Sequence, residues 1–81
     1  MILTPEACRA GRALLKWSMR DLAERSGVVF TTINRIEAGL QSPRSTTQRR
    51  IMAAFAEAGV EIVSDPDRTG ALLLLTHELH G

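Results

Sequence analysis

The sequence lacks the usual marks of secreted, membrane-spanning and disulfide-bonded proteins. Its single cysteine, Cys8, cannot form an internal disulfide. Its longest apolar run, Ala71–Leu75, is far shorter than the roughly 20 residues that span a bilayer. The N-terminus has no basic segment followed by an apolar one, so no signal peptide is predicted. We therefore expect a soluble protein of a reducing cytoplasm, without membrane contact.

The motifs by which many enzymes bind phosphates or activate nucleophiles are also missing. We find no glycine-rich phosphate loop, no nucleophile elbow and no pair of catalytic carboxylates. His77 and His80 lie three residues apart, whereas the zinc-protease signature needs a spacing of four and a third ligand. Cys8 has no base predicted beside it and is interpreted as a small packing residue. The sequence thus predicts neither an enzyme nor a cofactor or metal site.

The chain does contain enough apolar residues for one small domain, and its charges are unevenly spread. Of its 81 residues, 44% are hydrophobic and 23% are charged, a balance that favours a packed core over disorder. Residues 1–50 carry a net charge of +5, and residues 51–81 carry −4. This asymmetry predicts an N-terminal surface that can meet an anion, although chance scatter over a solvated surface would produce the same distribution.

Apolar residues recur with helical spacing over the first three quarters of the chain. Together with capping residues they predict four helices, over residues 5–16, 19–25, 29 or 30–38, and 45–58. The expected N-caps are Thr4, Ser18 and Ser45. A glycine that accepts left-handed backbone ends each of the last three helices: Gly27, Gly39 and Gly59.

The pattern changes in the last quarter of the chain. Residues 60–63 are rich in β-formers, residues 65–70 are turn formers, and residues 71–75 are apolar. We expect a β-hairpin in which residues 60–64 pair with residues 71–75. Because leucine favours helices, a fifth helix that continues through Leu79 is the alternative.

Residues 19–36 carry the most specific pattern in the chain. Two helices that cross steeply through a three-residue turn need a glycine at the turn and a small residue where their axes approach, and Gly27 and Ala23 meet these needs. The pair also needs apolar contacts, which the sequence supplies at Leu22, Val28, Ile33 and Ile36. The pattern indicates a helix-turn-helix, although any small helical domain can contain one such pair by chance.

The predicted third helix has two chemically different faces. At 100° per residue, one face is aliphatic and is made up of Val29, Ile33, Ile36 and Leu40. The opposite face presents Phe30, Thr31, Asn34 and Arg35. In a major groove, Arg35 can bind guanine and Asn34 can bind adenine, while Phe30 or the Thr31 methyl can touch a thymine methyl. This face predicts base reading; an ordinary solvated face is the alternative, which an exposed phenylalanine makes less favourable.

Further stretches extend this motif into a family pattern: residues 4–6, 12–15, 18, 22–28, 32–39 and 58–61. With them, residues 4–63 resemble the Cro/repressor helix-turn-helix family of XRE-like transcriptional regulators. The resemblance implies a mainly α fold, a compact four- to five-helix repressor-like domain whose third helix enters the major groove. It also implies a structural ion pair between Arg12 and Glu37. We accordingly divide the chain into a DNA-binding domain, residues 1–59, and a C-terminal extension, residues 60–81.

The sequence departs from the family pattern at Trp17, Met19 and Val29, where leucine, glutamine and a capping serine are common. Met19 cannot hydrogen-bond a phosphate, so Arg20 is the expected replacement. Thr32 completes the expected base-contacting residues, and phosphate contacts are expected beside the third helix. The phosphate candidates are Ser18, Arg20, Gln41, Ser42, Arg44 and, more weakly, Arg49. For each arginine taken alone, a solvated surface charge is the alternative.

These patterns predict a sequence-specific regulator of double-stranded DNA, a repressor that binds a palindromic operator as a homodimer. Two other functions use the same module: an antitoxin that neutralises a toxin protein and autoregulates its operon, and a restriction–modification controller protein. The predicted partners are thus operator DNA, a second copy of the chain and, in the antitoxin case, a toxin.

The dimer interface is expected in the acidic, leucine-rich C-terminus. A two-stranded hairpin alone is marginal in water and leaves open edges, so a second chain can stabilise it. The expected interface residues are Val60, Ile62, Leu72, Leu73, Leu74 and Leu75. The competing interpretation is that this segment only completes the core of the monomer.

Overall fold

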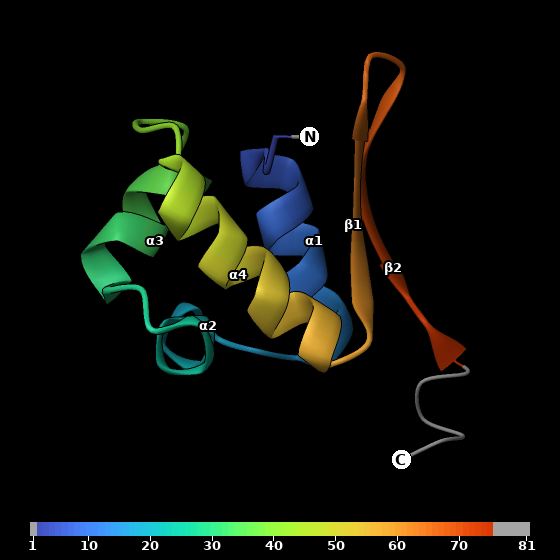
Figure 1. Ribbon diagram of the computed structural model, residues 1–81, viewed down its shortest axis with the longest axis horizontal. Coiled ribbons are helices and arrows are strands. Elements are labelled where there is room, and N and C mark those ends of the chain that lie inside the picture. Colours follow the sequence, from blue (N-terminus) through green and yellow to red (C-terminus); the bar gives the residue numbers. More distant parts are fainter. Residues whose placement is uncertain (1, 76–81) are drawn as a thin grey trace.

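The computed structural model, which describes residues 2–75, consists of four helices followed by a two-stranded antiparallel sheet (Figure 1). The elements are α1 (Pro5–Leu15), α2 (Met19–Ser26), α3 (Phe30–Glu37), α4 (Ser45–Glu57), β1 (Val60–Asp65) and β2 (Arg68–Leu73). The mainly α fold with a C-terminal hairpin is confirmed. Residues 71–73 form strand rather than helix, and residues 76–79 of the alternative helix lie outside the described residues. None of the helices in the described region is long and apolar enough to cross a membrane.

Two helices begin where their own side chains provide a cap. The Thr4 hydroxyl accepts a hydrogen bond from the Ala7 N–H at 3.0 Å, and Pro5 occupies the first turn of α1. At α2 the Ser18 hydroxyl accepts from the Asp21 N–H, while the Asp21 carboxylate accepts from the Ser18 N–H, a reciprocal capping box. Both caps were predicted from the residue types alone.

The beginning of α4 differs from the prediction. Ser45, the expected N-cap, is already helical, and the capping position is held by Arg44, which makes no side-chain capping bond. Val29 precedes α3 in the same way, without a capping bond, as its apolar side chain requires. Both α3 and α4 therefore start with N–H groups that no capping side chain satisfies.

Two residues assigned to the aliphatic face of the third helix are exposed instead. Val29 is 67% exposed and Leu40 is 70% exposed. Val29 has extended backbone, and Leu40 follows Gly39, whose φ of 75° ends the helical path. The 100° spacing does not hold outside the helix, so only Ile33 and Ile36 of that face enter the core.

The core lies among the four helices, and α1 and α4 pack against the inner face of the sheet. Its largest side chains are Phe55, Leu3, Leu22, Ile33, Ile36 and Ile51. Phe55 packs against Gly11, which has no side chain, and stacks on Trp17 with ring centroids 6.0 Å apart. Trp17 thus fills the space between α1 and α4 and is half-buried, so it replaces the usual leucine without disrupting the core.

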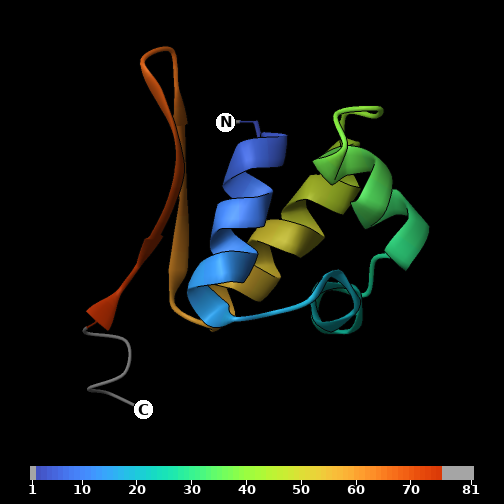
Figure 2. The same ribbon diagram turned by 180° about the vertical axis from the view of Figure 1, so that it is seen from behind.

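The hairpin is tighter than predicted. Pairing runs from Val60 opposite Leu73 to Asp65 opposite Arg68, and only two residues form the turn. The Asp65 carboxylate closes that turn by accepting hydrogen bonds from the N–H groups of Asp67 and Arg68. The inner face of the sheet covers α1, and α3 lies at the opposite end of the molecule (Figures 1 and 2).

Candidate nucleic-acid interface

The turn between α2 and α3 is stabilised by one glycine and one buried serine. Gly27 has a φ of 72°, and its N–H donates to the Ala23 carbonyl at 2.9 Å. The Ser26 hydroxyl donates to the Leu22 carbonyl at 2.6 Å and accepts from the Val28 N–H at 3.2 Å. These bonds satisfy the Ser26 hydroxyl and the Val28 N–H, both in buried residues, and they stabilise the turn that sets α3 relative to α2.

The solvent-facing side of α3 is polar and accessible. Thr31, Asn34 and Arg35 are exposed, whereas Phe30 and Thr32 are half-buried. Behind them, Ile33 and Ile36 are at most 1% exposed. The helix is therefore held by its aliphatic residues, and its other side is open to a ligand.

Phe30 does not stand free on this surface as the sequence suggested. The Arg20 guanidinium carbon lies 4.7 Å from the centroid of the Phe30 ring, a cation–π contact between α2 and the first residue of α3. The contact explains how an aromatic side chain is tolerated at the surface. It also holds the Arg20 charge beside the N-terminus of α3.

At the other end of α3, the chain turns back toward the helix. The Leu40 N–H donates to the Arg35 carbonyl at 2.9 Å, and the Gly39 N–H donates to the Ile36 carbonyl at 3.0 Å. This is a Schellman motif, which requires the left-handed backbone of Gly39. The next side chain, Gln41, reaches Arg35: Arg35 Nε donates to Gln41 Oε1 at 3.2 Å.

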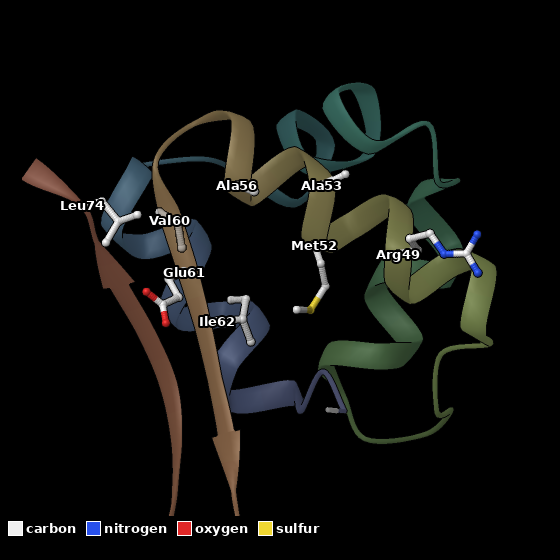
Figure 3. Close-up of a pocket in the computed structure, with 8 residues that line it drawn as sticks. All are labelled: Arg49, Met52, Ala53, Ala56, Val60, Glu61, Ile62 and Leu74. Carbon is white, nitrogen blue, oxygen red and sulfur yellow. The ribbon is translucent and has the colours of Figure 1, made fainter. Parts of the chain in front are cut away.

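All six predicted phosphate-contacting residues are exposed in the structure: Ser18, Arg20, Gln41, Ser42, Arg44 and Arg49. Gln41, Ser42 and Arg44 belong to the loop that follows α3. The Arg49 side chain points outward from α4 (Figure 3). The Ser18 hydroxyl already accepts the capping bond from Asp21, but a hydroxyl can still donate its own proton.

Arg12 and Glu37 form an ion pair between α1 and the last residue of α3. Arg12 Nε lies 2.7 Å from Glu37 Oε2, and Arg12 Nη2 lies 2.6 Å from Glu37 Oε1. The hydrogen bond to Glu37 raises the pKa of Arg12 above its ordinary value. Arg12 Nη1 also donates to the Trp17 carbonyl at 3.0 Å. The side chains of Arg12 and Glu37 are 19% and 5% exposed, so the ion pair is mostly buried.

Two partners of Glu37 were missed by sequence reasoning. The Cys8 thiol donates to Glu37 Oε2 at 3.3 Å, and Arg9 donates to the Glu37 backbone carbonyl. Burial, with the nearby Glu37 charge, raises the pKa of Cys8 far above its ordinary value. Cys8 lies four residues before Arg12 on the same side of α1, so this spacing was a usable signal.

No metal centre accompanies this interface within residues 2–75, where no group of three His, Cys, Asp or Glu side chains could hold an ion. His77 and His80 lie outside the described residues. The candidate interface is made up of α3, its flanking arginines and the loop after it.

Two helices joined by a tight turn, the second with an exposed polar face, are typical of DNA-binding helix-turn-helix domains. Residues 9–58 match the family described as helix-turn-helix, HTH_3, which comprises XRE-type regulators. The chain belongs to this family, and it is a DNA-binding transcription regulator. No curated protein sequence matches the chain.

Proposed function

We propose that this regulator is a sequence-specific repressor that binds a palindromic operator as a homodimer, with α3 in the major groove. The observation that carries the proposal is the contrast between the two sides of α3. Ile33 and Ile36 are buried, while Thr31, Asn34 and Arg35 are exposed. The exposed side chains carry the hydrogen-bonding and methyl groups that can contact base edges in a major groove.

The residue chemistry supports distinct roles on DNA. Arg35 binds guanine, Asn34 binds adenine, and Thr31 contacts a thymine methyl; Phe30 and Thr32, which are half-buried, contact the edges of the site. Phosphates are bound around α3 by Ser18, Arg20, Gln41, Ser42, Arg44 and Arg49. The phosphate contacts position the protein, and the contacts from α3 select the sequence.

The test is selection of binding sites from a pool of random duplexes by the full chain. We expect an enriched sequence with two-fold symmetry and half-sites about 34 Å apart. Affinity for it should fall steeply with salt, because each neutralised phosphate releases counterions. A reporter with the selected site over its promoter should be transcribed less. No enrichment over many rounds would refute sequence-specific binding.

The C-terminal hairpin is the surface that supports a homodimer. The inner face of the sheet packs on the helices, but Leu72, Leu74 and Leu75 are 54%, 41% and 69% exposed. Within the described chain the sheet has two strands, so each has one edge without a strand partner. An exposed apolar surface beside open edges is stabilised by pairing with a second chain. The hairpin lies opposite α3, which leaves α3 free for DNA (Figure 1).

A groove of about 520 Å³ continues this surface between α4 and β1 (Figure 3). Its walls are mainly apolar and are formed by Met52, Ala53, Ala56, Val60, Ile62 and Leu74, with Arg49 and Glu61 also lining it. Val60 and Ile62 are only 2% and 4% exposed, since they already belong to the core. In the dimer, Val60 and Ile62 therefore form the floor of the groove, and the exposed leucines make most of the contact with the partner chain.

The dimer is tested by changing one exposed leucine on the hairpin. Leu72→Glu should leave the fold intact, because the side chain is 54% exposed, and should shift the chain toward monomer in sedimentation at tens of micromolar. Leu40→Glu is the matched control, since Leu40 is exposed on the opposite side. A monomeric wild-type chain would refute the homodimer, and equal dimerisation of both variants would place the interface elsewhere.

A further inference from the structure

We propose that Gln41 is a positioning residue that holds Arg35 so that the two terminal nitrogens of its guanidinium read a guanine. The inference rests on the proposed function, because it concerns how the DNA-reading helix selects one base. Gln41 was expected only to touch a phosphate. The structure gives it a second contact, with the arginine proposed to read a base.

The donor geometry of Arg35 decides which of its edges is left for DNA. A guanidinium has one N–H on Nε and two on each terminal nitrogen, all in one plane. Arg35 Nε donates to Gln41 Oε1 at 3.2 Å. The end-on pair, Nη1 and Nη2, remains for a partner with two acceptors in a plane. The O6 and N7 atoms of guanine are such a pair in the major groove.

Backbone hydrogen bonds hold the loop that carries Gln41 close to Arg35. The Leu40 N–H is bound to the Arg35 carbonyl at 2.9 Å, so the residue just before Gln41 is tied to the residue that Gln41 contacts. Gly39, at a φ of 75°, allows this reversal. The loop backbone therefore places Gln41 within hydrogen-bonding reach of the Arg35 side chain.

Holding Arg35 before DNA arrives favours specific binding over non-specific binding. A free arginine on an exposed helix face loses much rotamer freedom when it docks on a base, and a preorganised one loses less. The Gln41 amide oxygen faces Arg35, so its NH₂ group is left to donate to a phosphate. The Gln41 side chain can thus contact a phosphate, which sets the register of the protein on the duplex, and at the same time position the arginine that contacts a base.

The test compares Gln41→Met, which keeps the side-chain length but removes the acceptor, with Gln41→Glu, which keeps an acceptor. The base position that Arg35 reads is first identified as the one at which Arg35→Ala loses its preference. The readout is the Kd for the selected duplex with another base at that position, divided by the Kd for the duplex with guanine there. We expect Gln41→Met to lower the guanine preference by about three- to tenfold, as for one exposed hydrogen bond. Gln41→Glu should bind every duplex more weakly, because its charge repels phosphates, yet keep the guanine preference within about twofold of wild type.

Two controls separate positioning from a general loss of binding. Ser42→Ala, in the same loop, should weaken all duplexes by one common factor. In the Arg35→Ala background, Gln41→Met should cause no further loss of base preference, because its target is gone. Thermal melting of the Gln41 variants should match wild type, since the side chain is exposed.

The outcomes distinguish this inference from the proposed function. If the wild-type chain enriches no sequence, sequence-specific binding itself fails. If it does enrich one, but Gln41→Met lowers affinity equally for all bases, Gln41 contacts only phosphate and the positioning role is refuted. Loss of guanine preference in both Gln41→Met and Gln41→Glu would also refute it, because the acceptor would then not matter.

Discussion

Glu37, the last residue of α3, accepts two hydrogen bonds from Arg12 of α1, at 2.6 and 2.7 Å. Arg12 in turn donates to the carbonyl of Trp17, in the connection between α1 and α2. The Arg12 side chain thus links three parts of the domain: α1, the connection between α1 and α2, and the end of α3. The pair fixes how α3 projects from the core, so it is structural although it lies close to the proposed DNA-binding surface.

Glu37→Ala should lower the free energy of unfolding by about 3 kcal/mol, because it leaves the Arg12 charge without its partner in a mostly buried site. Urea denaturation measures the change. Glu6→Ala is the matched control: its ion pair with Arg9 is exposed and 4.0 Å long, so its effect should stay within about 0.5 kcal/mol. In a double-mutant cycle with Arg12→Ala, additive losses would show that the two side chains do not interact energetically.

The Cys8 thiol should destabilise the fold at alkaline pH. Its folded-state pKa is raised by burial and by Glu37, so above the unfolded value of about 8.5 only the unfolded chain loses the proton. The free energy of unfolding should therefore receive the full contribution of the neutral thiol below about pH 8.5. Above that pH it should fall by up to about 1.4 kcal/mol per pH unit. Urea midpoints at pH 7, 9 and 10 measure the decline.

Cys8→Ala provides the reference for this decline, because it cannot release that proton. The stability of the wild-type chain relative to Cys8→Ala should therefore fall from pH 7 to pH 10. The native thiol should also resist iodoacetamide at pH 8 and react once urea unfolds the chain, since the thiolate is the reactive form. Parallel pH profiles, or rapid labelling of the folded protein, would contradict the assigned environment.

Lys16 follows α1 with left-handed backbone, at a φ of 58°. It is the one described non-glycine residue with positive φ, and an L side chain is strained there. Lys16→Gly should stabilise the domain by about 0.5–1 kcal/mol after the larger entropy of glycine in the unfolded chain is counted. The melting temperature should rise by about 3–6 °C. Lys16→Ala, which keeps the strain but loses the side chain, should show no rise; equal effects of both would point to the charge instead.

Features that depend on the chemistry of one residue were predictable from the sequence. Thr4 and Ser18 cap helices because their hydroxyls reach the next free N–H groups, and Gly27 and Gly39 turn the chain because only glycine accepts left-handed backbone at little strain. The burial of Leu22 and Ile33 followed from helical spacing, because both residues lie well inside their predicted helices. These local signals were sufficient for the four helices and the turn.

Features that depend on where an element ends were not predictable in the same way. Val29 and Leu40 were placed in the core because a helical spacing was extended past both ends of α3. The two-residue hairpin turn depends on the Asp65 carboxylate closing it, which composition alone did not indicate. The contacts of Arg20 with Phe30 and of Arg35 with Gln41 join side chains across a turn, so they require the fold itself.

Arg35 and Arg44 should affect DNA binding in different ways. Arg35→Ala should weaken binding to the selected site by about 1–3 kcal/mol and remove the preference at one base pair per half-site, because a bidentate base contact is lost. Arg44→Ala should weaken selected and random duplexes by a similar factor and reduce the slope of log K against log salt by about one unit. Fluorescence anisotropy at several salt concentrations, with both kinds of duplex, measures the two effects. Both side chains are exposed, so neither change should alter the melting temperature. If both variants kept wild-type affinity for the selected site, DNA would have to bind a face of the domain other than α3 and the loop that follows it.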